Sequence, residues 1–167
     1  MQRPGIKYIL MFIVLVVAQV LFLNQIQFSG FINPYVYVLF ILLLPLSAPR
    51  YAVLLLSFFI GLTIDVFSNT LGMHSFASVF IAYLRPAIIR VITNREEDMH
   101  DYPGMAYTGL AWFLTYTAIM VFIHHTVLFY IEVFTFHNFF NTLYRAFLSS
   151  LFSIFVIVLS QFIVFRD

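Results

Sequence analysis

The residue with the most unusual chemistry for its surroundings is Asp65, a carboxylate in the apolar block from Gly61 to Gly72. A carboxylate at mid-membrane costs roughly 2.5–3.5 kcal/mol, and less near the headgroups, so it usually has a partner, a solvated pocket or a function. Two arrangements would satisfy it. Arg145, expected near the same membrane surface, could form an ion pair with it. Alternatively, Asp65 faces water or accepts N–H bonds from the start of the following helix.

Histidines on the same side of the membrane raise the question of a metal site. They are His74, His124, His125 and His137, with Glu132 and Asp65 nearby. No pair has the i, i+4 spacing that places two imidazoles on one helix face, and His124 and His125 point about 100° apart on a helix. We therefore expect no metal, and histidines at the interface with their polar tips in water.

The residue patterns of common enzymes are missing from the sequence. There is no serine elbow, no phosphate-cradling glycine loop and no pair of carboxylates inside an apolar segment. The absence of cysteine removes a thiolate metal site and a cysteine nucleophile. The sequence therefore favours a protein that is not an enzyme and needs no cofactor.

The composition places these residues in a membrane protein. Of 167 residues, 63% are hydrophobic and 9% are charged, with a mean hydropathy of +1.01, whereas soluble domains average about 25% charged residues. We expect one all-α domain, a bundle of about six transmembrane helices. The expected spans are 6–23, 35–46, 51–66, 73–92, 105–129 and 142–165. The second is short for a spanning helix, and the charged segment from Thr93 to Gly104 is expected to be a solvated loop.

The basic residues indicate the orientation. With six spans and a cytoplasmic N-terminus, one side receives Arg3, Lys7, Arg50, Arg85, Arg90, Arg95 and Arg166. Only Arg145 lies on the other side, which is a strong positive-inside signal. Both termini are then cytoplasmic. The signal also supports the short second span, since dropping it would send Arg50 outward.

Small residues predict where helices pack closely. Gly61 lies one turn before Asp65 on the same helix face, where it would let another helix approach. Two further sets have helical spacing: His74, Ser78 and Ala82 in the fourth span, and Ala146, Ser149, Ser153 and Ser160 in the sixth. We interpret both sets as seams between helices.

The stretch from Ser57 to Pro86, SFFIGLTIDVFSNTLGMHSFASVFIAYLRP, resembles the signature of the MreD family of rod shape-determining membrane proteins. The matching features are Gly61, Asp65 four residues later, Leu71-Gly72 after a short turn, and a small-residue helix that ends in Ala82-Tyr83-Leu84. The overall layout of length and spans also fits that family.

The resemblance implies a bacterial inner-membrane scaffold of the cell-wall elongation machinery, similar in fold to the S-component of energy-coupling-factor vitamin transporters. It implies direct binding to the periplasmic protein MreC, in a complex with MreB, RodA and the transpeptidase partner of RodA. Gly61, Asp65, Gly72 and Tyr83 carry over to this chain, and we expect them to fix the hairpin of the third and fourth spans. The alternative is the substrate-binding membrane subunit of a vitamin-type transporter, with Gln19, His74 and the other histidines facing a cavity.

Overall fold

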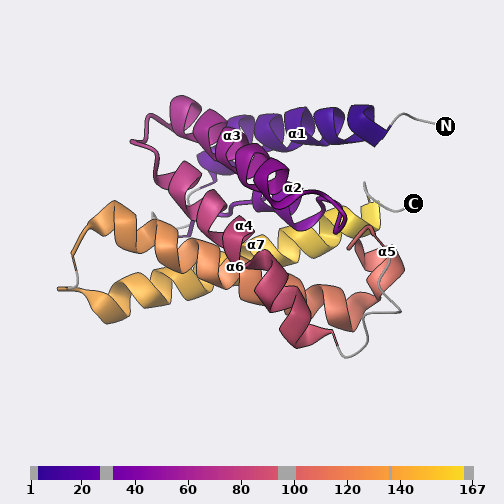
Figure 1. Ribbon diagram of the computed structural model, residues 1–167. Coiled ribbons are helices and arrows are strands. Elements are labelled where there is room, and N and C mark those ends of the chain that lie inside the picture. The colour runs from indigo at the N-terminus through magenta and orange to yellow at the C-terminus, as the bar shows by residue number, and fades with distance from the viewer. Residues whose placement is uncertain (1–3, 27–31, 94–100, 136, 164–167) are drawn as a thin grey trace.

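The computed structural model describes residues 4–26, 32–93, 101–135 and 137–163, which fold into a bundle of helices (Figure 1). The elements are α1 (Pro4–Leu21), η1 (Leu23–Gln25), α2 (Val38–Leu42), α3 (Arg50–Ser68), α4 (Met73–Ile92), α5 (Met105–Thr108), α6 (Leu110–Val133) and α7 (Phe139–Ile163). The predicted all-α membrane bundle is confirmed.

Five of the helices, α1, α3, α4, α6 and α7, are long and apolar enough to cross a membrane. The chain is therefore a multi-pass membrane protein. In Figure 1 the α3–α4 and α6–α7 turns lie at one end of the bundle, and the start of α1 and the end of α7 lie at the other. We call these the Asp65 end and the Arg50 end, after the residues of α3 that mark them.

The predicted helical span 35–46 is wrong in its secondary structure. Only Val38–Leu42 is α-helical, five residues in all, and the chain on both sides of it is not. Every residue from Tyr35 to Leu44 is buried. A segment that is apolar all round has no face to give to water, and here it packs inside the bundle. Pro34 and Pro45, which bracket it, also remove two backbone donors.

This buried segment runs through the bundle, from the side of His74 to the Arg50 end. The backbone N–H of Asn33 bonds to Ser149 of α7, whereas that of Leu46 bonds to the Asp101 carbonyl at the Arg50 end. We call this segment, residues 33–46, the buried crossing.

Other boundaries differ in smaller ways. The predicted span 105–129 is divided at Gly109, whose φ of +80° ends α5 before α6 begins. The α6 helix continues to Val133, and α7 begins at Phe139. Arg3, Arg95, Arg166 and most of the predicted charged loop lie outside the described residues.

Candidate functional site

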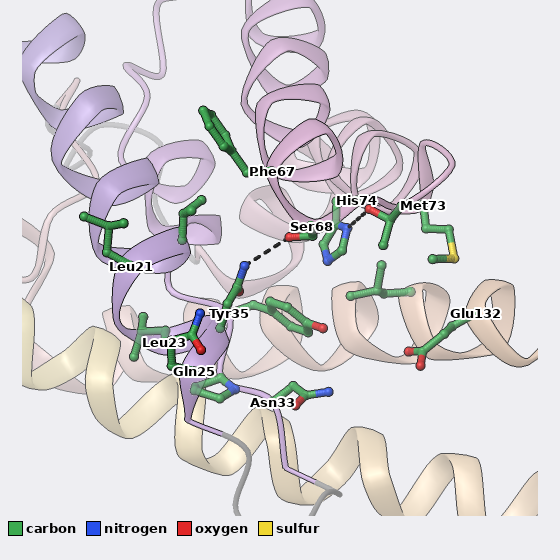
Figure 2. Close-up of a pocket in the computed structure, with 15 residues that line it drawn as sticks. Leu21, Leu23, Gln25, Asn33, Tyr35, Phe67, Ser68, Met73, His74 and Glu132 are labelled. Atoms are coloured by element: carbon green, nitrogen blue, oxygen red, sulfur yellow. Dashed lines mark hydrogen bonds between the residues drawn. The ribbon is translucent and has the colours of Figure 1, made fainter.

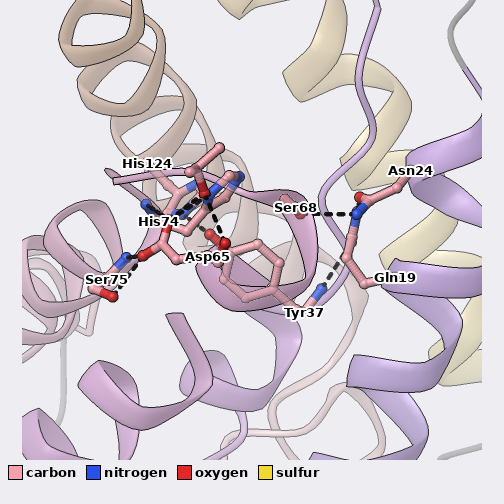
Figure 3. A network of polar contacts seen from close by, with 9 residues as sticks. Gln19, Asn24, Tyr37, Asp65, Ser68, His74, Ser75 and His124 are labelled. Atoms are coloured by element: carbon pink, nitrogen blue, oxygen red, sulfur yellow. Dashed lines mark hydrogen bonds and ion pairs between the residues drawn. The ribbon is translucent and has the colours of Figure 1, made fainter. Parts of the chain in front are cut away.

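Asp65 lies at the centre of the α3–α4 turn and is only 2% exposed. One carboxylate oxygen accepts from the Thr70 hydroxyl at 2.6 Å, and from both the backbone N–H and the Nδ1 of His74 at 3.0 Å. The other accepts from the backbone N–H of Ser75 at 2.9 Å and from its hydroxyl at 2.6 Å. Figure 3 shows His74 and Ser75, at the start of α4, beside the carboxylate. The charge is satisfied entirely by its own hairpin.

The network replaces a missing helix cap. The N-cap residue of α4 is Gly72, which has no side chain to accept the free N–H groups of the first turn. Asp65 accepts two of these, from His74 and Ser75, across the turn. Negative charge at a helix N-terminus is also stabilised by the helix dipole. Asp65 therefore caps α4 from α3, as the second of the two arrangements predicts.

Gly61 and Gly72 make this turn possible for different reasons. A Cβ on Gly61 would lie 2.5 Å from the Cα of Ser75 and 2.7 Å from the His74 carbonyl oxygen, so only glycine lets α3 and α4 approach this closely. Gly72 has a φ of +82°, a left-handed conformation that other residues resist. Both roles agree with those expected from the sequence.

The first of the two arrangements, an ion pair between Asp65 and Arg145, is not formed in the structure. The α4 N-terminus occupies both oxygens of Asp65, and Arg145 instead donates to Glu132 at 3.0 Å. The Arg145 guanidinium also lies over the ring of Phe129, 4.1 Å from its centre. Glu132 is partly exposed, so the pair belongs to the surface and contributes at most about 1 kcal/mol.

Polar side chains hold the buried crossing on the Asp65 side. The Gln19 amide, fully buried in α1, donates to the Pro34 carbonyl at 2.9 Å and accepts from the Val36 N–H at 2.8 Å. Ser153 accepts from the Tyr35 N–H at 2.9 Å. In α7, the predicted seam residues Ala146, Ser149 and Ser153 are fully buried. The serines of this seam also supply hydrogen-bond partners for irregular backbone.

Arg85 performs the same task on the Arg50 side. It is 4% exposed, and its guanidinium donates to the carbonyl groups of Leu44 and Pro45 and to the Tyr116 hydroxyl. Irregular backbone at membrane depth is tolerated only where protein surrounds it and satisfies its polar groups. Gln19 and Arg85, polar residues inside apolar runs, were the sequence signals for this crossing.

Three histidines and two tyrosines gather in the core of the Asp65 side. The ring of Tyr35 lies 5.3 Å from those of His74 and His125, and the Tyr37 hydroxyl is 2.7 Å from His124 Nε2. His124 and His125 are fully buried, so their predicted placement at the interface with wet tips is wrong. His137 is exposed.

Hydrogen bonding assigns a structural role to His125. Its Nδ1 lies 2.8 Å from the Val121 carbonyl oxygen and must donate to it, and its Nε2 lies 3.0 Å from the Ser153 hydroxyl. The ring thus extends the hydrogen bond from the Tyr35 N–H to Ser153. Within the described part of the chain, no three metal-ligating side chains are grouped to hold an ion.

A cavity of about 490 Å³ opens beside this cluster, between α1, the α3–α4 turn and α6 (Figure 2). Its polar lining includes Asn24, Asn33, Tyr35, His74 and Glu132. The buried His74 Nε2 has no hydrogen-bond partner. Asn24 of η1 also links α1 to α3, because it accepts from Gln19 at 2.9 Å and donates to Ser68 at 3.0 Å. The volume is typical of a small-molecule site.

Tyr83, which was expected to help fix the hairpin, instead points outward, with 72% of its surface exposed. Gly61 and Asp65 are buried, and Gly72 lies in the turn. Of the four residues carried over from the resemblance, Gly61, Asp65 and Gly72 therefore build the hairpin, and Tyr83 faces the surroundings of the bundle.

Comparisons of the chain with protein-family models, with curated proteins and with solved structures give no match.

Proposed function

We propose that the chain is a membrane scaffold of the bacterial cell-wall elongation machinery, of the MreD type, which binds MreC and helps to organise MreB, RodA and its transpeptidase partner. The observation that carries the proposal is the α3–α4 hairpin. Its residues Gly61, Asp65 and Gly72, on which the resemblance rests, all serve its internal geometry. A rigid hairpin suits binding, and no catalytic step is assigned to it.

Partner contact is expected on the exposed face of α4. Phe76, Phe80 and Tyr83 follow one another at i, i+4 and i+7 and are 57%, 37% and 72% exposed. We call these residues the α4 stripe. Residues at this spacing share one helix face, and a partner helix in a membrane packs against such a face through van der Waals contact. Asp65, at 2% exposure, is too deeply buried to contact a partner directly.

The proposed location is the inner membrane with both termini in the cytoplasm. Among the described residues, Lys7, Arg50, Arg85 and Arg90 belong to the Arg50 half of the bundle. Arg145 is at the opposite end, near the end of α6. The buried crossing keeps the count of crossings even, so the positive-inside argument still applies.

The test is affinity purification of the chain from its native membrane in mild detergent, followed by identification of the co-purifying proteins. MreC, with or without RodA, is the expected partner. Recovery of an ATPase module in place of MreC would contradict the scaffold and favour a transporter.

The second candidate is a substrate-binding membrane subunit, favoured by the cavity of about 490 Å³ beside His74. Several of its polar groups already bond within the chain, for example Asn24 to Gln19 and Ser68. Thermal stabilisation of the purified chain by a vitamin-like solute, abolished by His74→Phe, would support this candidate. The absence of stabilisation across a panel of such solutes would count against it.

A further inference from the structure

A second cavity, of about 480 Å³, lies at the Arg50 end between the start of α3 and the last turns of α4. Apolar side chains make up much of its wall, among them Val53, Leu54, Ala82 and Leu84. Tyr83 also lines it. Because Arg50 is the first residue of α3 and Arg90 lies in the last turn of α4, the cavity sits where the helices leave the membrane core.

Three arginines line this cavity, and no carboxylate does. They are Arg50, Arg85 and Arg90. Arg50 and Arg90 are exposed, and within residues 4–26, 32–93, 101–135 and 137–163 none of the three forms an ion pair. The cavity thus joins apolar walls to a rim of positive charge.

Arg85 adds to this charge from inside the protein. Its hydrogen bonds all go to neutral oxygens, the carbonyl groups of Leu44 and Pro45 and the Tyr116 hydroxyl. Because no negative charge offsets it, this buried cation acts on its neighbours through surroundings of low dielectric constant, where electrostatic interactions are strong. An anion in the adjacent cavity would therefore be attracted more strongly than by exposed arginines alone.

We propose that this cavity binds the phosphate headgroup of an anionic membrane phospholipid. Arginine presents a planar fork of donors that matches phosphate oxygens, and basic pockets between transmembrane helices are known to hold acidic headgroups. The apolar walls suit the start of the acyl chains, which free phosphate does not have. The lipid therefore fits both parts of the site.

The experiment uses the purified full chain in detergent and counts bound lipid by native mass spectrometry. The probes are phosphatidylglycerol and phosphatidylcholine with identical acyl chains, and separately inorganic phosphate. Wild type is expected to prefer phosphatidylglycerol by about 30-fold, from two surface arginines. The Arg50→Gln, Arg90→Gln double variant should lose most of that preference.

Two further variants separate the cavity from general surface charge. Lys7→Gln removes a positive charge from the same end of the bundle at a residue that does not line the cavity, and should keep the preference. Ala87→Trp places a large side chain at an exposed position of the lining with every arginine retained, and should weaken lipid binding. It also serves as the test if the double variant does not fold.

Several results would overturn the proposal. They are equal binding of the two lipids by wild type, an unchanged preference in the double variant or in Ala87→Trp, an equal loss in Lys7→Gln, or equally tight binding of inorganic phosphate. The measurement involves no protein partner, so its outcome is separate from the test of the scaffold.

Discussion

At the scale of single residues, Asp65 stabilises the hairpin through its charge and its two acceptor oxygens together. Replacing it with Asn keeps the size but puts an NH₂ group where N–H and O–H donors of α4 converge. We expect Asp65→Asn to lower the free energy of unfolding by roughly 2–4 kcal/mol, because buried donors lose a charged acceptor. Thermal unfolding in detergent measures the loss.

The matched control for this prediction is Glu132→Gln, which is the same chemical change at a partly exposed carboxylate. It should cost less than about 1 kcal/mol. Equal losses in the two variants would mean that the Asp65 network contributes no more than a surface ion pair.

Gly61 gives a second prediction at this scale. Gly61→Ala adds a methyl group 2.5 Å from backbone of α4, so the helices must move apart. We expect a loss of roughly 1–3 kcal/mol from this overpacking. Gly5→Ala in α1, where nothing lies within 4 Å of the added atom, should stay within about 1 kcal/mol of wild type. If both variants have the melting temperature of wild type, the close approach of α3 to α4 at Gly61 does not stabilise the fold.

The sequence predicted the roles of Gly61 and Gly72, but it could not decide which group pairs with Asp65. Gly61 predicts close helix packing because a residue without a side chain lets another helix approach. The choice between Arg145 and the α4 N-terminus depends on how the α6–α7 hairpin is placed, which is a tertiary property. His124 and His125 were misplaced for the same reason, because composition does not reveal which side of α6 faces the bundle.

At the scale of elements, the buried crossing depends on side chains that satisfy its backbone. Gln19→Leu would remove the amide that bonds to the Pro34 carbonyl and the Val36 N–H, leaving both groups buried without that partner. We expect a loss of roughly 2–4 kcal/mol. Gln25→Leu makes the same change at an exposed residue and should have an effect within about 0.5 kcal/mol. Equal melting temperatures of Gln19→Leu and wild type would contradict this role.

The helical content of the five long elements was predictable because long apolar runs admit little else in a bilayer. The irregular backbone of the buried crossing could not be predicted. A short apolar run has no periodicity that would distinguish a buried helix from buried non-helical chain. Pro34 suits the first position of a helix, where its missing N–H costs nothing, but the structure has no helix until Val38. The side chains that hydrogen-bond to the backbone of this segment are those of Gln19, Ser153 and Arg85, which are distant from it in sequence.

At the scale of the whole molecule, the number of crossings determines which loops share a side. The chain has no cysteine, so single cysteines report membrane sidedness without background. Gln25→Cys and Leu71→Cys should react with an impermeant reagent from one side, and Ser47→Cys from the other. All three sites are exposed. Labelling of Gln25→Cys and Ser47→Cys from the same side would show that residues 33–46 do not cross.

The central claim is that the α3–α4 hairpin is a rigid scaffold that presents the α4 stripe to MreC. Photo-crosslinking in the native membrane tests it most directly, with the photoreactive residue placed at Tyr83 or Phe76, and at Phe155 of α7 as a control of similar exposure. We predict a crosslink to MreC from the α4 positions and none from Phe155. A crosslink from Phe155 alone, or no crosslink to MreC from any position, would contradict the account.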